Sequence, residues 1–175
     1  MIYYSDEHIT VRDLEQEDVP VFVSGEISQG WHSTDEKLLG RIKDRESGKS
    51  TALAAEYDGK PAGYVSVYFD SQWGSFGGMG YPEIVDFAVL EKYRRRGVGS
   101  RLMDTAEKIA SEKCDTVYLG VGLHNGFGSA QRMYVKRGYI PDGTGAWYGD
   151  KVCTPYDTVY TNDDDLVLYL SKKLR

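Results

Sequence analysis

The stretch Arg94-Arg95-Arg96-Gly97-Val98-Gly99 constrains this chain more than any other, because it joins an apolar run, 84–90, to an amphipathic segment, 100–112. This order predicts a strand, a tight basic turn and a helix. Glycines let the backbone approach a bound group closely, because they carry no Cβ. The first N–H groups of a helix have no partner inside it, and the helix dipole adds positive charge there. The stretch therefore predicts an anion site that would fit a pyrophosphate.

The segment after the turn has the pattern of a helix that packs along one side. Its apolar residues recur at spacings of three and four: Val98, Leu102, Ala106, Ile109 and Ala110. The turn is not a P-loop, which ends in Gly-Lys-Ser/Thr, and it lacks the third glycine of a dinucleotide-binding turn. On these residues alone, an ordinary strand-to-helix turn with solvated arginines is the alternative.

The turn matches the Q/R-x-x-G-x-G/A signature of the GNAT superfamily of N-acetyltransferases, and the chain resembles that family from about residue 82 to 139. The surrounding features follow the family's order: the strand 83–90, the strand 116–121, Asn125, Ala130, Tyr134 and the run Lys136-Arg137-Gly138-Tyr139. The resemblance implies that acetyl-CoA is the acetyl donor, that no metal takes part, and that the acetyl group passes directly to an amine in a ternary complex.

The resemblance also implies which residues hold the cofactor. The pyrophosphate would be bound by Arg94, Arg95, Arg96, Gly97, Val98, Gly99 and Ser100. Phe87, Ala88 and Val89 would pair with the pantetheine arm like an added strand, in the family's wedge between two splayed strands. The N–H of Val89 would polarise the thioester carbonyl. Asn125 would contact the pantetheine, although it stands further from Ala130 than in the family's usual spacing.

Acetyl transfer needs a neutral amine, hydrogen-bond donors for an oxyanion, and a proton for the leaving thiolate. Glu83 is the predicted base, because Glu83-Ile84-Val85 resembles the catalytic strand of histone-acetyltransferase-type members. Asp86 is the alternative base, and a water chain is another. Tyr134 is the predicted general acid, because it resembles the family tyrosine whose hydroxyl reaches the CoA sulfur. A solvated strand-end carboxylate and a core tyrosine are the purely structural alternatives.

Charge and composition limit the partners. The 21 basic and 27 acidic residues give a net charge of −6, which argues against a nucleic-acid surface. Lys92 and the three arginines after it form a local basic cluster. The apolar runs are too short to span a membrane, and the first residues lack a signal-peptide pattern. Two cysteines without a C-x-x-C motif, and scattered histidines, favour a reduced cytoplasmic setting without a metal site.

The whole pattern predicts an α+β fold: one acetyltransferase domain over 1–175, with a mixed, mostly antiparallel sheet of about six or seven strands flanked by about four helices. Asp58-Gly59 predicts a hairpin between two β-rich runs. A helix is expected over 14–23, interrupted at Pro20. Ser33 or Thr34 is expected to cap the next helix, with a capping box from Ser33.

The acceptor stays open between a small-molecule amine and a protein amine, and the oligomeric state stays open, with a homodimer as one option. Aromatic residues in two loops are candidates to frame the acceptor: Trp31, His32, Trp147, Tyr148, Tyr156 and Tyr160. Two functions of other classes compete with the enzyme. Binding of CoA without transfer would favour a non-catalytic acyl-CoA sensor domain, and failure to bind CoA would favour a protein-interaction module.

Overall fold

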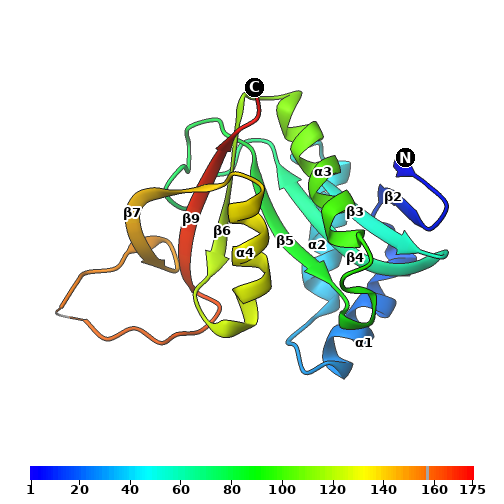
Figure 1. Cartoon of the computed structure of the whole chain (residues 1–175), viewed down its shortest axis with the longest axis horizontal. Coiled ribbons are helices and arrows are strands. Elements are labelled where there is room, and N and C mark those ends of the chain that lie inside the picture. Colours follow the sequence, from blue (N-terminus) through cyan, green and yellow to red (C-terminus); the bar gives the residue numbers. More distant parts are fainter. Residues whose placement is uncertain (157) are drawn as a thin grey trace. The chain divides into compact units, whose positions relative to one another are not determined.

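The computed structural model describes residues 1–156 and 158–175, which group into two compact units. The first unit contains residues 1–68 and 84–112, and the second contains residues 69–83 and 113–175. The first unit carries β1 (Ile2–Ser5), β2 (Ile9–Asp13), α1 (Val19–Ser28), α2 (Asp35–Glu46), β3 (Ser50–Tyr57), β4 (Lys60–Tyr68), β5 (Glu83–Val89, whose first residue belongs to the second unit) and α3 (Val98–Ser111), with short 3-10 helices at Gln16–Asp18 and Glu91–Tyr93 (Figure 1).

The strands of the first unit follow one another in the sheet in the order β1-β2-β3-β4-β5. The pairs β1–β2, β2–β3 and β3–β4 are antiparallel. The predicted hairpin is confirmed: Tyr57 pairs with Lys60, and Asp58 and Gly59 have φ angles of 49° and 72°. Two successive positive φ angles are typical of the hairpin turn whose twist matches that of the strands.

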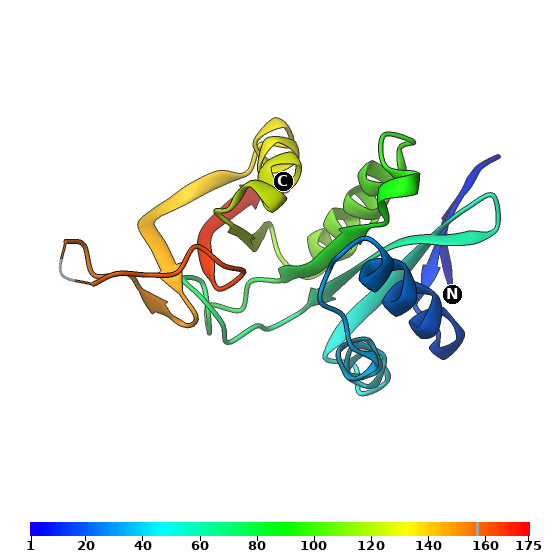
Figure 2. The same ribbon diagram turned by 90° about the horizontal axis from the view of Figure 1, so that it is seen from below.

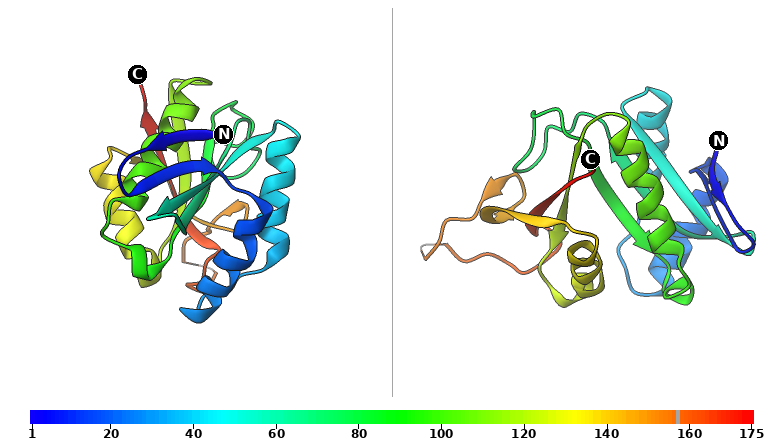
Figure 3. Two further views of the ribbon diagram at one scale, coloured as in Figure 1. Left: turned by 90° about the vertical axis from the view of Figure 1, so that its right-hand side faces the viewer. Right: turned by 45° about the horizontal axis from the view of Figure 1, so that its top comes forward.

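Helices cover both faces of this sheet, with α3 on one face and α1 and α2 on the other (Figures 2 and 3). The core on the α1–α2 face is closed by Phe22, Leu38, Ile42, Ala52 and Tyr64, among others, all of them buried. The core on the α3 face includes the fully buried Leu102, Met103 and Ala106. Each face therefore buries an apolar layer, which supplies most of the driving force for folding.

Two local expectations for the first unit are wrong. Pro20 is the second residue of α1 and does not interrupt it, because proline fits the first helical turn, where its missing N–H has no partner to lose. The helix then continues to Ser28. Thr34 is the N-cap of α2 without a side-chain hydrogen bond, and the Ser33 hydroxyl donates to the Glu26 carboxylate. The expected capping box is therefore absent from this helix.

The second unit carries four strands and one longer helix. In sheet order the strands are β6 (Thr116–Gly122), β9 (Leu166–Lys173), β7 (Ile140–Tyr148) and β8 (Lys151–Val152). The helices of this unit are α4 (Gly128–Lys136) and a 3-10 helix at Asn125–Phe127. All three strand pairs are antiparallel. The last strand, β9, lies between β6 and β7 and pairs with both (Figure 1).

The α+β class, the four helices and the mostly antiparallel sheet are confirmed, but the strand number is corrected. The described residues form nine strands, against the six or seven expected. The two additional strands are β1, which has four residues, and β8, which has two. Such short strands give too few residues for an alternation pattern to be recognised. Within the described ranges, every helix is too short or too polar to cross a membrane.

Candidate functional site

The turn between β5 and α3 leads directly into the first turn of a helix. Gly97 is the N-cap of α3 with a φ of 87°, and the first helical bond runs from the N–H of Arg101 to the carbonyl of Gly97. The N–H groups of Val98, Gly99 and Ser100 therefore lie in the first helical turn, where the helix supplies no acceptor. Because Gly97 has no side chain to cap them, this end of α3 is suited to bind an anion.

The arginines of the turn are held by aromatic rings of the first unit. The guanidinium of Arg94 lies 5.4 Å from the ring centroid of Trp31, and that of Arg96 lies 5.1 Å from the ring of Tyr57. Both contacts are within the range of cation–π attraction. The side chains thus keep positive charge at the turn, while Gly97 leaves the backbone open. Trp31, one of the aromatic residues expected at the acceptor, therefore contacts the turn between β5 and α3.

The orientation of the strand before the turn fits the expected pantetheine contacts. The N–H of Leu90 donates to the carbonyl of Ala62, and a Cβ on Gly63 would lie 2.6 Å from the carbonyl oxygen of Ala88. Residues 88 and 90 therefore direct their polar backbone groups towards β4. Since these groups alternate along a strand, the N–H of Val89 points to the edge of β5 away from β4.

Glu83, the predicted base, belongs to the second unit and is buried, since the residue is only 7% exposed. The hydroxyl of Ser71 donates to its Oε2 at 2.5 Å. Burial and then the charge of Glu83 raise the pKa of Tyr118 above its ordinary value, and the same causes raise the pKa of Tyr169 to about 12. A carboxylate in these surroundings is not the solvated strand-end group of the structural alternative.

Asp86, the alternative base, lies in the first unit and is paired with a cation. The Nε of Arg41 donates to its Oδ2 at 2.5 Å. The side chain of Asp86 is therefore engaged in an ion pair with α2. The φ angle of Asp86 is 54°, so the backbone of β5 is irregular at this residue.

Tyr134, the predicted acid, lies on α4 in the second unit and is 5% exposed. Its ring centroid is 5.8 Å from that of Tyr139, in a tilted arrangement. Burial raises the pKa of Tyr134 above its ordinary value. The phenol therefore keeps its proton at neutral pH, which a general acid requires.

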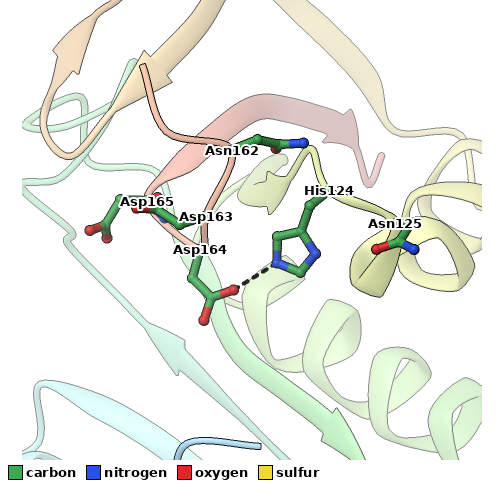
Figure 4. Close-up of a pocket in the computed structure, with 6 residues that line it drawn as sticks. All are labelled: His124, Asn125, Asn162, Asp163, Asp164 and Asp165. Atoms are coloured by element: carbon green, nitrogen blue, oxygen red, sulfur yellow. Dashed lines mark hydrogen bonds and ion pairs between the residues drawn. The ribbon is translucent and has the colours of Figure 1, made fainter. Parts of the chain in front are cut away.

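Asn125 lines an open hollow of about 490 Å³ in the second unit, together with His124 and the loop 162–165 (Figure 4). The Nδ1 of His124 accepts a hydrogen bond from the N–H of Gly126, and its Nε2 lies 2.8 Å from the Oδ1 of Asp164. Because Nδ1 accepts, Nε2 is the ring nitrogen that donates to Asp164. Asn125 thus has acidic neighbours, and its contact with pantetheine stays a prediction.

The predicted site residues are divided between the units. The first unit brings together the turn and Phe87–Val89, whereas the second contains Glu83, Asn125 and Tyr134. Sequence reasoning missed Ser71 and Arg41, the partners of the two candidate bases. Neither residue is part of a motif, and each lies in a segment distant from its partner. In the described residues, no group of three or more histidine, cysteine or acidic side chains could hold a metal ion.

Comparison with known proteins gives results for both sequence and fold. The model of the Acetyltransferase (GNAT) family matches residues 10–139. A curated N-alpha-acetyltransferase of Sulfurisphaera tokodaii is 33% identical over 95 residues, which are 50% of this chain and 54% of that protein. The chain therefore matches about half the length of this relative.

Solved structures share the fold at low sequence identity. Ard1 from Thermoplasma volcanium has a TM-score of 0.68 and 21% identity, with 95% of this chain and 97% of that chain covered. The structure of yncA from Salmonella typhimurium with its cofactor acetyl-CoA has a TM-score of 0.68 and 17% identity, with 97% and 95% covered. At these identities the likeness is one of fold.

The buried phenol of Tyr134 predicts how stability depends on pH. Its pKa is raised in the folded state, so its contribution to stability is fully present below pH about 10, the unfolded pKa, and is lost as pH rises beyond it. Above pH 10, the unfolding free energy of the unmodified protein should decrease with pH. In Tyr134→Phe this decrease should be less steep, by up to about 1.4 kcal/mol per pH unit, because the phenol is absent. Urea denaturation at pH 9, 10 and 11 measures this slope.

Tyr156→Phe is the matched control, because Tyr156 is fully exposed. Its slope should equal that of the unmodified protein. Equal slopes for all three proteins would contradict the raised pKa of Tyr134.

Proposed function

Since the chain belongs to the GNAT acetyltransferase family, we propose that it is an acetyl-CoA-dependent N-acetyltransferase. The observation that carries this proposal is the β5–turn–α3 segment. It combines a Val89 N–H directed away from β4 with first-turn N–H groups behind Gly97. The turn would bind the pyrophosphate of acetyl-CoA, and the strand would bind its pantetheine. The acetyl group would pass directly from the thioester to an amine in a ternary complex.

The proposed proton transfers use the two buried groups of the second unit. Glu83 would take a proton from the acceptor amine, with Ser71 orienting its carboxylate. The N–H of Val89 would stabilise the oxyanion that forms on the thioester carbonyl. Tyr134 would donate its proton to the departing thiolate. The C–N bond would form as the C–S bond breaks. Glu83 would end the transfer protonated and Tyr134 deprotonated, and exchange with water would return both groups to their starting states.

We propose the N-terminal α-amino group of a peptide or protein as the acceptor. The relative from Sulfurisphaera tokodaii is named an N-alpha-acetyltransferase. An α-amino group has a pKa of about 7.7–8.0, so about a tenth of it is neutral at pH 7, whereas for lysine the neutral fraction is on the order of one in a thousand. An acceptor of this type needs only a modest base, which a carboxylate such as Glu83 can supply.

A thiol-release assay with acetyl-CoA tests the activity. Three acceptors are compared: a lysine-free peptide with a free N-terminus, the same peptide with a blocked N-terminus and one lysine, and a panel of small amines. We expect thiol release and an acetylated product with the first peptide only, and no thiol release without an acceptor, since transfer is direct. Transfer to a small amine alone would replace the proposed acceptor. Binding of CoA without any transfer would favour the sensor, and no binding would favour the interaction module.

The role of the turn is tested at Gly97, whose φ of 87° strains any residue with a Cβ, aspartate no more than alanine. Gly97→Asp should weaken acetyl-CoA binding at least tenfold more than Gly97→Ala, because only the aspartate repels phosphate. Arg95→Ala should have a smaller effect than either, because the backbone makes the main contacts. Isothermal titration calorimetry measures these affinities.

Gly48→Asp controls for backbone strain alone, since Gly48 has a φ of 77° and no atom within 4 Å of an added Cβ. It should bind acetyl-CoA as the unmodified protein does. Unchanged affinity in Gly97→Asp would exclude the turn as the pyrophosphate site.

The base is tested by Glu83→Gln, which keeps the shape of the side chain and removes the charge. We expect kcat/KM to fall by roughly 10²–10⁴, the usual range for general acid–base catalysis, with nearly unchanged acetyl-CoA affinity. The loss of rate at acidic pH should also flatten. Tyr134→Phe is the comparison variant: it should lower kcat but keep that acidic limb. Activity within a few-fold of normal in Glu83→Gln would point to Asp86 or a water chain.

A further inference from the structure

The irregularity of β5 lies directly before the residues proposed to bind pantetheine. Asp86 has a φ of 54°, in the left-handed region that residues with a Cβ adopt only at a cost. A change of backbone direction at residue 86 determines which edge of the strand the following N–H groups face. Phe87, Ala88 and Val89 follow at once, so their orientation depends on the conformation of Asp86.

The guanidinium of Arg41, on α2, forms hydrogen bonds with both Asp86 and Tyr68. Its Nε donates to the Asp86 carboxylate at 2.5 Å, and its Nη1 donates to the hydroxyl of Tyr68 at 2.6 Å. The Tyr68 hydroxyl in turn donates to the carboxylate of Asp44, which lies one helical turn after Arg41. The side chains of Arg41 and Asp86 are only 29% and 18% exposed. One planar guanidinium thus fixes the end of β4 and the irregular residue of β5 against the same helix.

The polar contacts of Arg41 lie apart from the proposed chemistry. Within the described residues, its hydrogen bonds and ion pair are with Asp86 and Tyr68, and its guanidinium lies over the Tyr68 ring. Phe87 and Val89 face α3, since a Cβ on Gly99 would contact both side chains. Arg41 thus approaches β5 from the α2 face, opposite to α3.

We propose that Arg41 is a positioning residue for acetyl transfer. By holding Asp86 in the left-handed conformation, it directs the N–H of Val89 towards the thioester carbonyl. This inference rests on the proposed function, because it assigns Arg41 a part in the same reaction. It differs from that function in predicting that a residue of α2, without contact to the acetyl donor, sets the rate of transfer.

A double-mutant cycle with glycine at position 86 separates positioning from direct contact. Glycine adopts a positive φ without the penalty of a Cβ, so Asp86→Gly makes the partner at position 41 unnecessary. Arg41→Gln alone should lower kcat about 100-fold, the size of effect known for small misplacements at a reacting centre. In the Asp86→Gly background, Arg41→Gln should change kcat by no more than a few-fold. Asp86→Gly alone could lower kcat as much as Arg41→Gln does. The double variant should then have the same kcat as either single variant, because the two residues act as one unit.

Arg45→Gln is the matched control from the same helix. Arg45 is also partly buried, but it donates to the carbonyl of Leu14 and not to β5. It should lower the melting temperature as Arg41→Gln does and leave kcat unchanged. Arg41→Lys should restore only part of the rate, because an ammonium cannot bond Asp86 and Tyr68 with the same fixed geometry.

A binding measurement keeps this test independent of the proposed activity. Hydrogen exchange of the Val89 amide, followed by NMR, should slow when acetyl-CoA binds to the unmodified protein and slow less in Arg41→Gln. If the chain transfers no acetyl group but shows this difference, the proposed function fails and the positioning role holds. Equal loss of kcat from Arg41→Gln in both backgrounds, or normal kcat and normal Val89 protection in Arg41→Gln, would overturn the inference.

Discussion

The proposed chemistry of this chain depends on backbone N–H groups, and regular strands and helices leave few such groups available. Three residues between the middle of β5 and the start of α3 have positive φ angles: Asp86 at 54°, Arg95 at 60° and Gly97 at 87°. Only glycine takes this conformation without a steric cost. The segment therefore needs contacts from elsewhere in the first unit, and Arg41 supplies one of them at Asp86. The N–H groups of the turn and of β5 to which cofactor binding is proposed both depend on this departure from regular geometry.

Arginine side chains bring positive charge to the turn before α3, while Gly97 leaves its backbone without a covering side chain. The chain has a net charge of −6, so the basic cluster at residues 92–96 is a local exception. The guanidinium groups of Arg94 and Arg96 rest on Trp31 and Tyr57, which limits the freedom of these long side chains. Side chains ordered before binding lose less entropy when a ligand arrives. A polyanionic cofactor would therefore meet a prearranged positive field together with accessible N–H groups.

In the second unit, the carboxylate of Glu83 and the phenol of Tyr134 are both buried. Glu83 accepts from Ser71, and its charge contributes to the raised pKa of Tyr118 and Tyr169. Burial raises the pKa of Tyr134, so the phenol keeps its proton at neutral pH. A carboxylate that accepts protons and a phenol that retains its proton are the two complementary groups that acetyl transfer needs. Their surroundings, more than their residue types, suit them to the proposed roles.

Local sequence determined most elements of the fold and the glycine turn before α3. The Asp58-Gly59 hairpin, the apolar stripe of α3 and the glycines of the turn are signals carried by neighbouring residues, and the structure contains each of them. The misplaced features have local explanations too: Pro20 suits the start of a helix as well as an interruption, and β8 is too short for a pattern.

What only the tertiary structure decided is which partner each candidate base has. Ser71 and Glu83 are 12 residues apart, and Arg41 and Asp86 are 45 residues apart. No periodicity relates such positions, because the packing of a helix and of a loop against the strand β5 brings them together. The sequence by itself identified two carboxylates on one strand and left the choice of base open. The fold gives them different surroundings, since it buries Glu83 beside the hydroxyl of Ser71 and pairs Asp86 with the guanidinium of Arg41.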